Sequence, residues 1–199
     1  MLHCNPIASP INLNEKLHSE DSSGKIDGSK YRKIVGNLLY LTHTHPDIIH
    51  VVSVVARFMQ TPTKHHYEAV KRILRYVSGT TGYGIHYTKN EEFVLFGYFD
   101  SDWGGSSDDR RSTTGWVFSL GSGAVAWCSM KQLVTALLST EAEYISITSA
   151  ACEAVWLRRL LADMNEKQEL PIIIRCDNSS AISIARNPTH HSRTKYIDT

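Results

Sequence analysis

The chain has 199 residues, of which 42% are hydrophobic, so it can bury one sizeable core or two small ones. Its 21 Lys and Arg residues nearly balance its 20 Asp and Glu residues, and any nucleic acid binding would therefore need a local basic patch. The 4 cysteines form no CxxC pair, which argues against a zinc knuckle. The sequence shows no classical secretion signal and no apolar run long enough to span a membrane, so we expect an intracellular protein.

The first half of the chain predicts an arm followed by helices. Residues 1–30 are rich in Ser, Asn, Asp, Gly and Pro without sustained periodicity, which is typical of a flexible, extended or disordered arm. Residues 31–80 show three apolar patterns at helical spacing, the second of which opens at Pro46. We expect a small helical subdomain there.

Residues 84–199 predict an α/β domain. The segments IHY with FVLFGYFD, GWVFSLG and AVAWCS read as strands of an antiparallel meander. A long helix is expected from Thr140 to about Met164, because Thr140 and Glu143 match the S/T-x-x-E capping box. The short, nearly all-apolar segment PIIIRCD is typical of a strand covered on both faces, and a short helix follows at residues 180–186.

Three acidic motifs, YFDSDWGG, STEAEY and RCDN, lie where these elements begin or end. Hard cations such as Mg²⁺ prefer oxygen ligands, and a two-metal site that cleaves phosphodiesters gathers carboxylates from distant parts of a chain. Each motif also has an ordinary explanation. Asp100 or Asp102 can shape a turn, Glu143 can belong to the capping box, and Asp177 can cap the last helix.

The motifs belong to a longer stretch that resembles the ribonuclease H domain of copia-type (Ty1/copia) retrotransposon Pol polyproteins. It reads GYFDSDWGGSSDDRRSTTGWVFSLGSGAVAWCSMKQLVTALLSTEAEYISI, followed by RCDNSSAISIARNPTHHSRTKYID. The preceding stretch, from YRKIVGNLLYLTHTHPDIIH to KRILRYVSGTTGYGIHY, resembles the segment that joins reverse transcriptase to that domain in the same polyproteins. The sequence departs from the family at Leu138, where a serine is usual, and at Tyr196, where a histidine is usual.

The resemblance implies an RNase H-like mixed sheet with helices, and selects Asp100, Glu143 and Asp177 as catalytic residues and metal ligands. It also implies two Mg²⁺ ions and cleavage of the RNA strand of RNA–DNA hybrids. In the family, a fourth carboxylate follows a fifth strand in an A-D-x-x-T-K-like segment, which lies beyond Thr199, and Asp198 is not its equivalent. We therefore expect a domain truncated before its last strand, weak or inactive as a nuclease alone. We also expect an open edge at residues 172–174 that favours self-association.

Two further sets of residues carry hypotheses about binding. Arg110 and Arg111, in the loop after the first strand, are candidates for contact with a nucleic acid backbone. Arg72, Leu74 and Arg75 in RILR match R-x-L-R, the translocation motif of secreted oomycete effectors. This match favours an alternative function, in which a secreted pathogen effector has recruited transposon sequence. Such a protein would act without catalysis on host proteins, in the host nucleus or cytoplasm.

Overall fold

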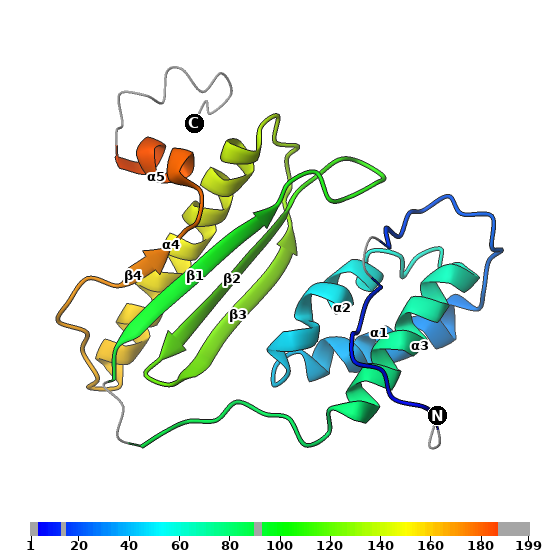
Figure 1. Ribbon diagram of the computed structural model, residues 1–199, viewed down its shortest axis with the longest axis horizontal. Helices are drawn as coiled ribbons and strands as arrows, with labels where there is room; N and C mark the ends of the chain where they lie inside the picture. The colour runs from blue at the N-terminus through cyan, green and yellow to red at the C-terminus, as the bar shows by residue number, and fades with distance from the viewer. Residues whose placement is uncertain (1–3, 13–14, 90–92, 187–199) are drawn as a thin grey trace. The chain divides into compact units, whose positions relative to one another are not determined.

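The computed structural model describes residues 4–12, 15–89 and 93–186, which form two compact units (Figure 1). The first unit comprises Met1–Gly84 with Ser106–Asp109, and the second comprises Ile85–Gly105 with Arg110–Thr199. Tyr196 and Asp198 lie outside the described residues. Over the described ranges, no helix combines the length and apolar character needed to cross a membrane.

The first unit is helical, as its apolar patterns predict. Its elements in chain order are α1 (Gly28–Leu41), the 3-10 helix η1 (Pro46–Ile48), α2 (Ile49–Ala56) and α3 (Lys64–Gly79). Helix α1 begins inside the expected arm because Asp27 caps it, accepting a hydrogen bond from the Ser29 amide at 2.9 Å. Helix α3 begins with a capping box between Thr63 and His66.

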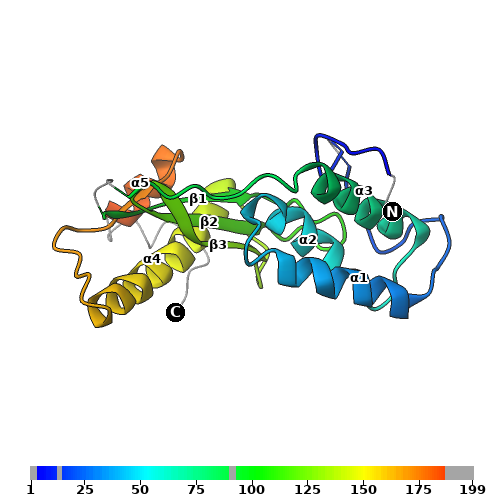
Figure 2. The same ribbon diagram turned by 90° about the horizontal axis from the view of Figure 1, so that it is seen from below.

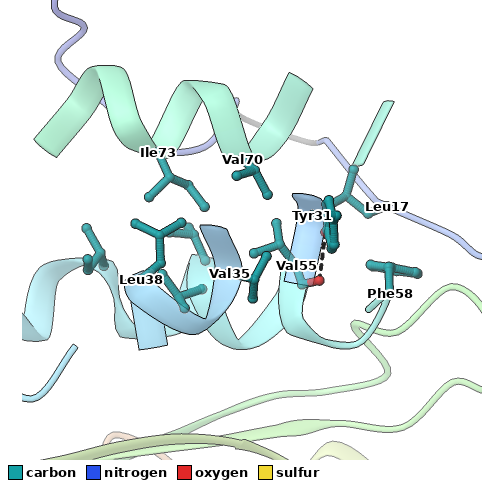
Figure 3. Close-up of a cluster of buried hydrophobic side chains, with 11 residues drawn as sticks. Leu17, Tyr31, Val35, Leu38, Val55, Phe58, Val70 and Ile73 are labelled. Carbon is teal, nitrogen blue, oxygen red and sulfur yellow. Dashed lines mark hydrogen bonds between the residues drawn. The ribbon is translucent and has the colours of Figure 1, made fainter. Parts of the chain in front are cut away.

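Apolar side chains from all three α-helices meet in the core of this unit (Figure 3). Tyr31 is fully buried there, and its hydroxyl donates a hydrogen bond to the Val55 carbonyl at 2.8 Å. This bond satisfies the only polar group of the buried Tyr31 side chain. Burial raises the pKa of the Tyr31 hydroxyl. The other labelled members of the cluster are Leu17, Val35, Leu38, Phe58, Val70 and Ile73.

The segment before α1 contains no helix or extended strand in its described parts, yet it packs against the helices. Leu17 is only 8% exposed and belongs to the helical core. The Thr63 hydroxyl donates a hydrogen bond to Asp21, and the ring of His66 contacts the His18 carbonyl at 3.1 Å. This segment is thus ordered by burial, by side-chain hydrogen bonds and by an isolated antiparallel bridge between Lys25 and Thr63.

The second unit contains a mixed sheet of four strands in the order β3-β2-β1-β4. The antiparallel meander predicted from the sequence is confirmed, and β4 adds to it in parallel with β1. The strands are β1 (Leu95–Asp102), β2 (Thr113–Leu120), β3 (Gly123–Lys131) and β4 (Ile173–Arg175).

Helix α4 (Ser139–Asp163) lies against one face of this sheet, and the short helix α5 (Ser179–Arg186) follows β4 (Figures 1 and 2). The core between α4 and the sheet joins Leu95, Phe99 and Phe118 to Ala150 and Leu157. With the helical unit before it, this mixed α/β arrangement confirms the predicted fold class and is consistent with an RNase H-like fold. The sheet and α4 position the candidate site.

Three local predictions are wrong. Residues 85–87 form no strand and are held beside β3 instead, where the Tyr87 hydroxyl donates to the Ala124 carbonyl at 2.6 Å. No capping box forms at Thr140, because α4 begins earlier, with Leu138 at its N-cap position. Strand β4 is not covered on both faces, since Ile173 is 60% exposed, although its edge position among the described strands agrees with the expected open edge.

Candidate metal centre

The structure brings together Asp100, Glu143 and Asp177, the three carboxylates selected by the resemblance. One carboxylate oxygen from each residue lies within 4.8 Å of the corresponding oxygens of the other two. Three elements bring these distant residues together. Asp100 is on β1, Glu143 is on the first turns of α4, and Asp177 lies just after β4. Such a cluster of like charges is costly unless a proton or a cation neutralises part of it.

The parallel pairing of β1 with β4 explains why two of these carboxylates meet. Tyr98 is the register partner of Arg175, the last paired residue of β4. The pair is reinforced by a hydrogen bond of 2.8 Å from the Arg175 guanidinium to the Tyr98 hydroxyl. Asp100 and Asp177 each lie two residues further along, so both carboxylates reach the same end of the sheet.

Glu143 is the buried member of the cluster. Its side chain is only 6% exposed, and within the described part of the chain its Oε2 atom has no hydrogen-bond partner. Burial, followed by the negative charges of Asp100 and Asp177, raises the pKa of Glu143 to about 7, while the hydrogen bond from the Ser101 amide acts in the opposite direction. Asp100 and Asp177 are exposed, so the site combines one buried carboxylate with two that solvent reaches.

The local geometry also decides between the ordinary explanations of each motif. The Asp102 carboxylate packs on Gly105 in the turn after β1, where an added Cβ would lie 1.6 Å from its oxygen, whereas Asp100 belongs to the carboxylate cluster. Asn178 caps α5, since its Oδ1 accepts from the Ser180 and Ala181 amides at 3.0 Å. Asp177 is therefore not needed as the cap.

The start of α4 is held to the sheet by buried polar side chains that the sequence did not single out. Gln132 is 4% exposed, and its Nε2 lies 3.0 Å from the Ala142 carbonyl, 3.1 Å from the Thr114 hydroxyl and 3.4 Å from that of Ser146. Because a carbonyl only accepts, the contact with Ala142 fixes the orientation of the amide. Ala142 directly precedes Glu143, so this cluster positions the buried carboxylate.

The other predicted binding residues do not belong to the carboxylate cluster. Arg110 and Arg111 lie in the loop between β1 and β2, and Arg110 is exposed with a positive φ of 58°. Arg72, Leu74 and Arg75 lie on α3 of the helical unit, and all three are partly buried. The R-x-L-R residues thus form part of a packed helix rather than of an extended segment.

Known proteins similar to this chain include long transposon polyproteins. It is 39% identical over 197 residues to the retrovirus-related Pol polyprotein from transposon RE1 of Arabidopsis thaliana, covering 99% of this chain and 13% of that protein. It is 40% identical over 196 residues to the retrovirus-related Pol polyprotein from transposon TNT 1-94 of Nicotiana tabacum, covering 97% of this chain and 15% of that protein. Over nearly its whole length, the chain is therefore homologous to a segment of the Pol polyproteins of copia-type transposons.

The similarity to Pol polyproteins is accompanied by a second similarity. The chain is 44% identical over 128 residues to secreted RxLR effector protein 161 of Plasmopara viticola, covering 64% of this chain and 90% of that protein. It spans about one seventh of the length of the Pol polyproteins, 14% for transposon RE2. No protein-family model matches the chain, and no solved structure matches it.

Proposed function

We propose that this chain carries the RNase H-type site of a copia-type Pol polyprotein, which cleaves the RNA strand of RNA–DNA hybrids. The convergence of Asp100, Glu143 and Asp177 within 4.8 Å is the observation that carries the proposal. On this account the protein acts inside the cell that produces it. Selectivity for RNA over DNA would come from contacts with the 2′-hydroxyl group.

The chemistry of the three side chains fits a hard divalent cation. All the ligand atoms are carboxylate oxygens, which Mg²⁺ prefers, and they stand close enough to share ions. A cation would also relieve the repulsion that, after burial, helps raise the pKa of Glu143 to about 7. Mg²⁺ held at such a site activates water and stabilises the leaving oxygen.

The residues of the chain have distinct roles in this proposal. Exposed Asp100 and Asp177 would hold the ions where the scissile phosphate approaches, and buried Glu143 would fix them against the sheet. Arg110 and Arg111, in the loop that begins shortly after Asp100, would contact the nucleic acid backbone. These 199 residues supply three of the four carboxylates that the family resemblance implies, so we expect weak cleavage from them alone.

Cleavage of a labelled RNA annealed to DNA tests this function. We expect slow, Mg²⁺-dependent cleavage that Asp100→Asn abolishes. Asp102→Asn is the matched control, because it removes an equivalent charge two residues away at a position packed on Gly105. Cleavage that survives Asp100→Asn would contradict the site, and turnover near the ~10 s⁻¹ of ordinary enzymes would contradict the expected weakness.

The similarity to an RxLR effector supports a second candidate function. In that case the protein would be secreted and would act on host proteins without catalysis, using Arg72 and Arg75 for translocation. Arg75 already donates a hydrogen bond from Nε to the Asn5 carbonyl at 2.8 Å, which ties it to the fold. We expect Arg72→Ala with Arg75→Ala to leave uptake into host cells unchanged, and a loss of uptake with the fold intact would favour the effector function.

A further inference from the structure

A cavity of about 430 Å³ lies inside the helical unit, between α3 and the segment that precedes α1. It is separate from the carboxylate cluster, and none of its lining residues belongs to the proposed nuclease site. Charged and polar side chains dominate its described lining. They are Lys71, Arg72 and Arg75 with His65 and Glu68 on α3, and Asn12 and Glu15 on the preceding segment.

One of the two acidic residues in this lining already has partners. The Glu15 carboxylate lies 2.9 Å from His65 Nε2 through one oxygen and accepts a hydrogen bond of 2.5 Å from the Asn12 amide through the other. Glu68 is the second acidic residue and is exposed. The three cationic side chains of the cavity therefore outnumber its carboxylates, which favours an anionic ligand.

Arg72 is the residue that points most clearly to a missing partner. Its Nε atom is buried, and in the described part of the structure neither a hydrogen-bond acceptor nor a carboxylate pairs with its guanidinium. Arg72 also lines a small, mostly apolar space together with Leu17, Val55 and Ile73, so its side chain lies between the core and the charged cavity. A buried donor without an acceptor is unusual and is commonly completed by a ligand or an ordered water.

The neighbouring cations extend this arrangement. Lys71 Nζ lies 5.4 Å from the centroid of the Tyr67 ring, an attraction that leaves its three donors available. Arg75 donates a hydrogen bond from Nε to the Asn5 carbonyl, which leaves its two terminal nitrogens as donors for a ligand. The Nε–H and Nη–H edge of an arginine matches two oxygens of a phosphate group, with lysine adding a point charge.

We infer that this cavity binds an oxyanion, and that its ligand is a backbone phosphate of the nucleic acid on which the proposed nuclease site acts. The inference rests on that proposed function for the source of the phosphate. That the ligand is an oxyanion is inferred from the cationic lining of the cavity and does not depend on the proposed function. Arginine and lysine contacts to backbone phosphates position a nucleic acid without reading its sequence, so we expect binding without sequence preference.

The first experiment follows the Arg72 Nε–H signal of the full chain by NMR while inorganic phosphate is added at constant ionic strength. We expect a saturable shift of this signal, with a much smaller shift when chloride replaces phosphate. The absence of a saturable shift would overturn the oxyanion site. This measurement uses the unaltered protein, so it does not depend on a variant that folds.

The second experiment measures binding of a labelled RNA–DNA hybrid in a metal chelator, so that cleavage plays no part. Arg72→Gln should weaken binding about tenfold, the scale of a lost charge-assisted bidentate contact. Lys64→Gln is the matched control, because it removes one charge from the same helix outside the cavity, and should cost less than about twofold. Arg72→Lys should fall between them, since it keeps the charge but loses the planar edge.

The outcomes separate this inference from the proposed function. If phosphate shifts the Arg72 signal while Arg72→Gln and Lys64→Gln weaken hybrid binding equally, the site is one for free oxyanions and the nucleic acid assignment is overturned. If the unaltered chain does not bind the hybrid but phosphate still shifts the signal, the proposed function fails together with that assignment, and the oxyanion site survives. A selective loss in Arg72→Gln, with unchanged circular dichroism, supports the whole inference.

Discussion

Asp100 on β1 and Asp177 just after the parallel strand β4 each lie two residues beyond the register pair Tyr98 and Arg175. Backbone pairing thus brings together the two chain segments that carry the exposed carboxylates, and the two residues after β4 place Asp177 beside Asp100. Glu143 then approaches from α4 and completes the cluster. The site is therefore held by regular elements, which favours a fixed ligand geometry.

The mutual repulsion of these carboxylates predicts an effect of Asp177→Asn on Glu143. Removing the Asp177 charge should lower the pKa of Glu143 from about 7, because that charge is one of the groups that raise it. The change should be modest, since burial is the larger cause. NMR titration of the Glu143 side-chain carbon in metal-free protein measures it, and an unchanged or higher pKa would contradict the proximity of the two groups.

The raised pKa of Glu143 also predicts how stability depends on pH. Between pH 4.5 and about 7 the folded state binds a proton that the unfolded state has released, so the free energy of unfolding should fall as pH rises through this window. In metal-free protein, this decrease in the free energy of unfolding should be up to about 3 kcal/mol smaller in Glu143→Gln than in the unaltered chain.

Tryptophan fluorescence provides the readout for this pH dependence. All 4 tryptophans lie in the second unit, so their signal follows the unfolding of the part that carries Glu143. The informative quantity is the difference between the unaltered chain and Glu143→Gln, which cancels the other titrating groups. A difference that stays constant from pH 4 to pH 8 would show that Glu143 titrates normally.

Gln132 is expected to position the metal ligand as well as to stabilise the fold. Gln132→Met keeps a similar volume but loses the donor to the Ala142 carbonyl, which should cost about 1–3 kcal/mol of unfolding free energy and also weaken Mn²⁺ binding. Gln168→Met is the control, because Gln168 bonds the backbone of Phe93 and Leu95 where β1 begins, away from Asp100. Equal effects of both variants on Mn²⁺ affinity would show that Gln132 has only a general structural role.

Much of the fold follows from the sequence, because its signals are local. The meander is predicted by alternation and turn residues, and the helices of the first unit by their apolar spacing and by Pro46. The error at Thr140 has a simple cause, since a matching S/T-x-x-E pattern does not form a capping box when the helix starts one residue earlier. Helix boundaries are decided by packing that short patterns do not contain.

The candidate site is harder to predict from local sequence patterns. Each carboxylate had an ordinary explanation, and only the family resemblance selected Asp100 over Asp102. The contribution of Gln132 depends on a contact with Ala142 between two separate elements, which no spacing in a single sequence reveals. The same is true of Arg72, since the match of RILR to R-x-L-R does not reveal that the Arg72 Nε atom is buried.

The edge position of β4 supports a prediction about association. Ile173 is 60% exposed, and within the described sheet β4 pairs only with β1, so a further strand can add there. We expect the 199-residue chain to self-associate with rising concentration, as measured by sedimentation velocity, and Ile173→Lys to reduce this association. A chain that stays monomeric at high micromolar concentration, with freely exchanging amides at residues 172–174, would contradict the prediction.

Direct measurement of divalent-cation binding tests the central proposal that Asp100, Glu143 and Asp177 form a metal site. Titration calorimetry with Mn²⁺ and Mg²⁺ compares the unaltered chain with Asp100→Asn and with the control Asp102→Asn. We predict saturable binding that Asp100→Asn weakens by at least about tenfold, while Asp102→Asn changes it less than about twofold. Equal affinities in all three proteins, or no saturable binding in the unaltered chain, would contradict the metal site.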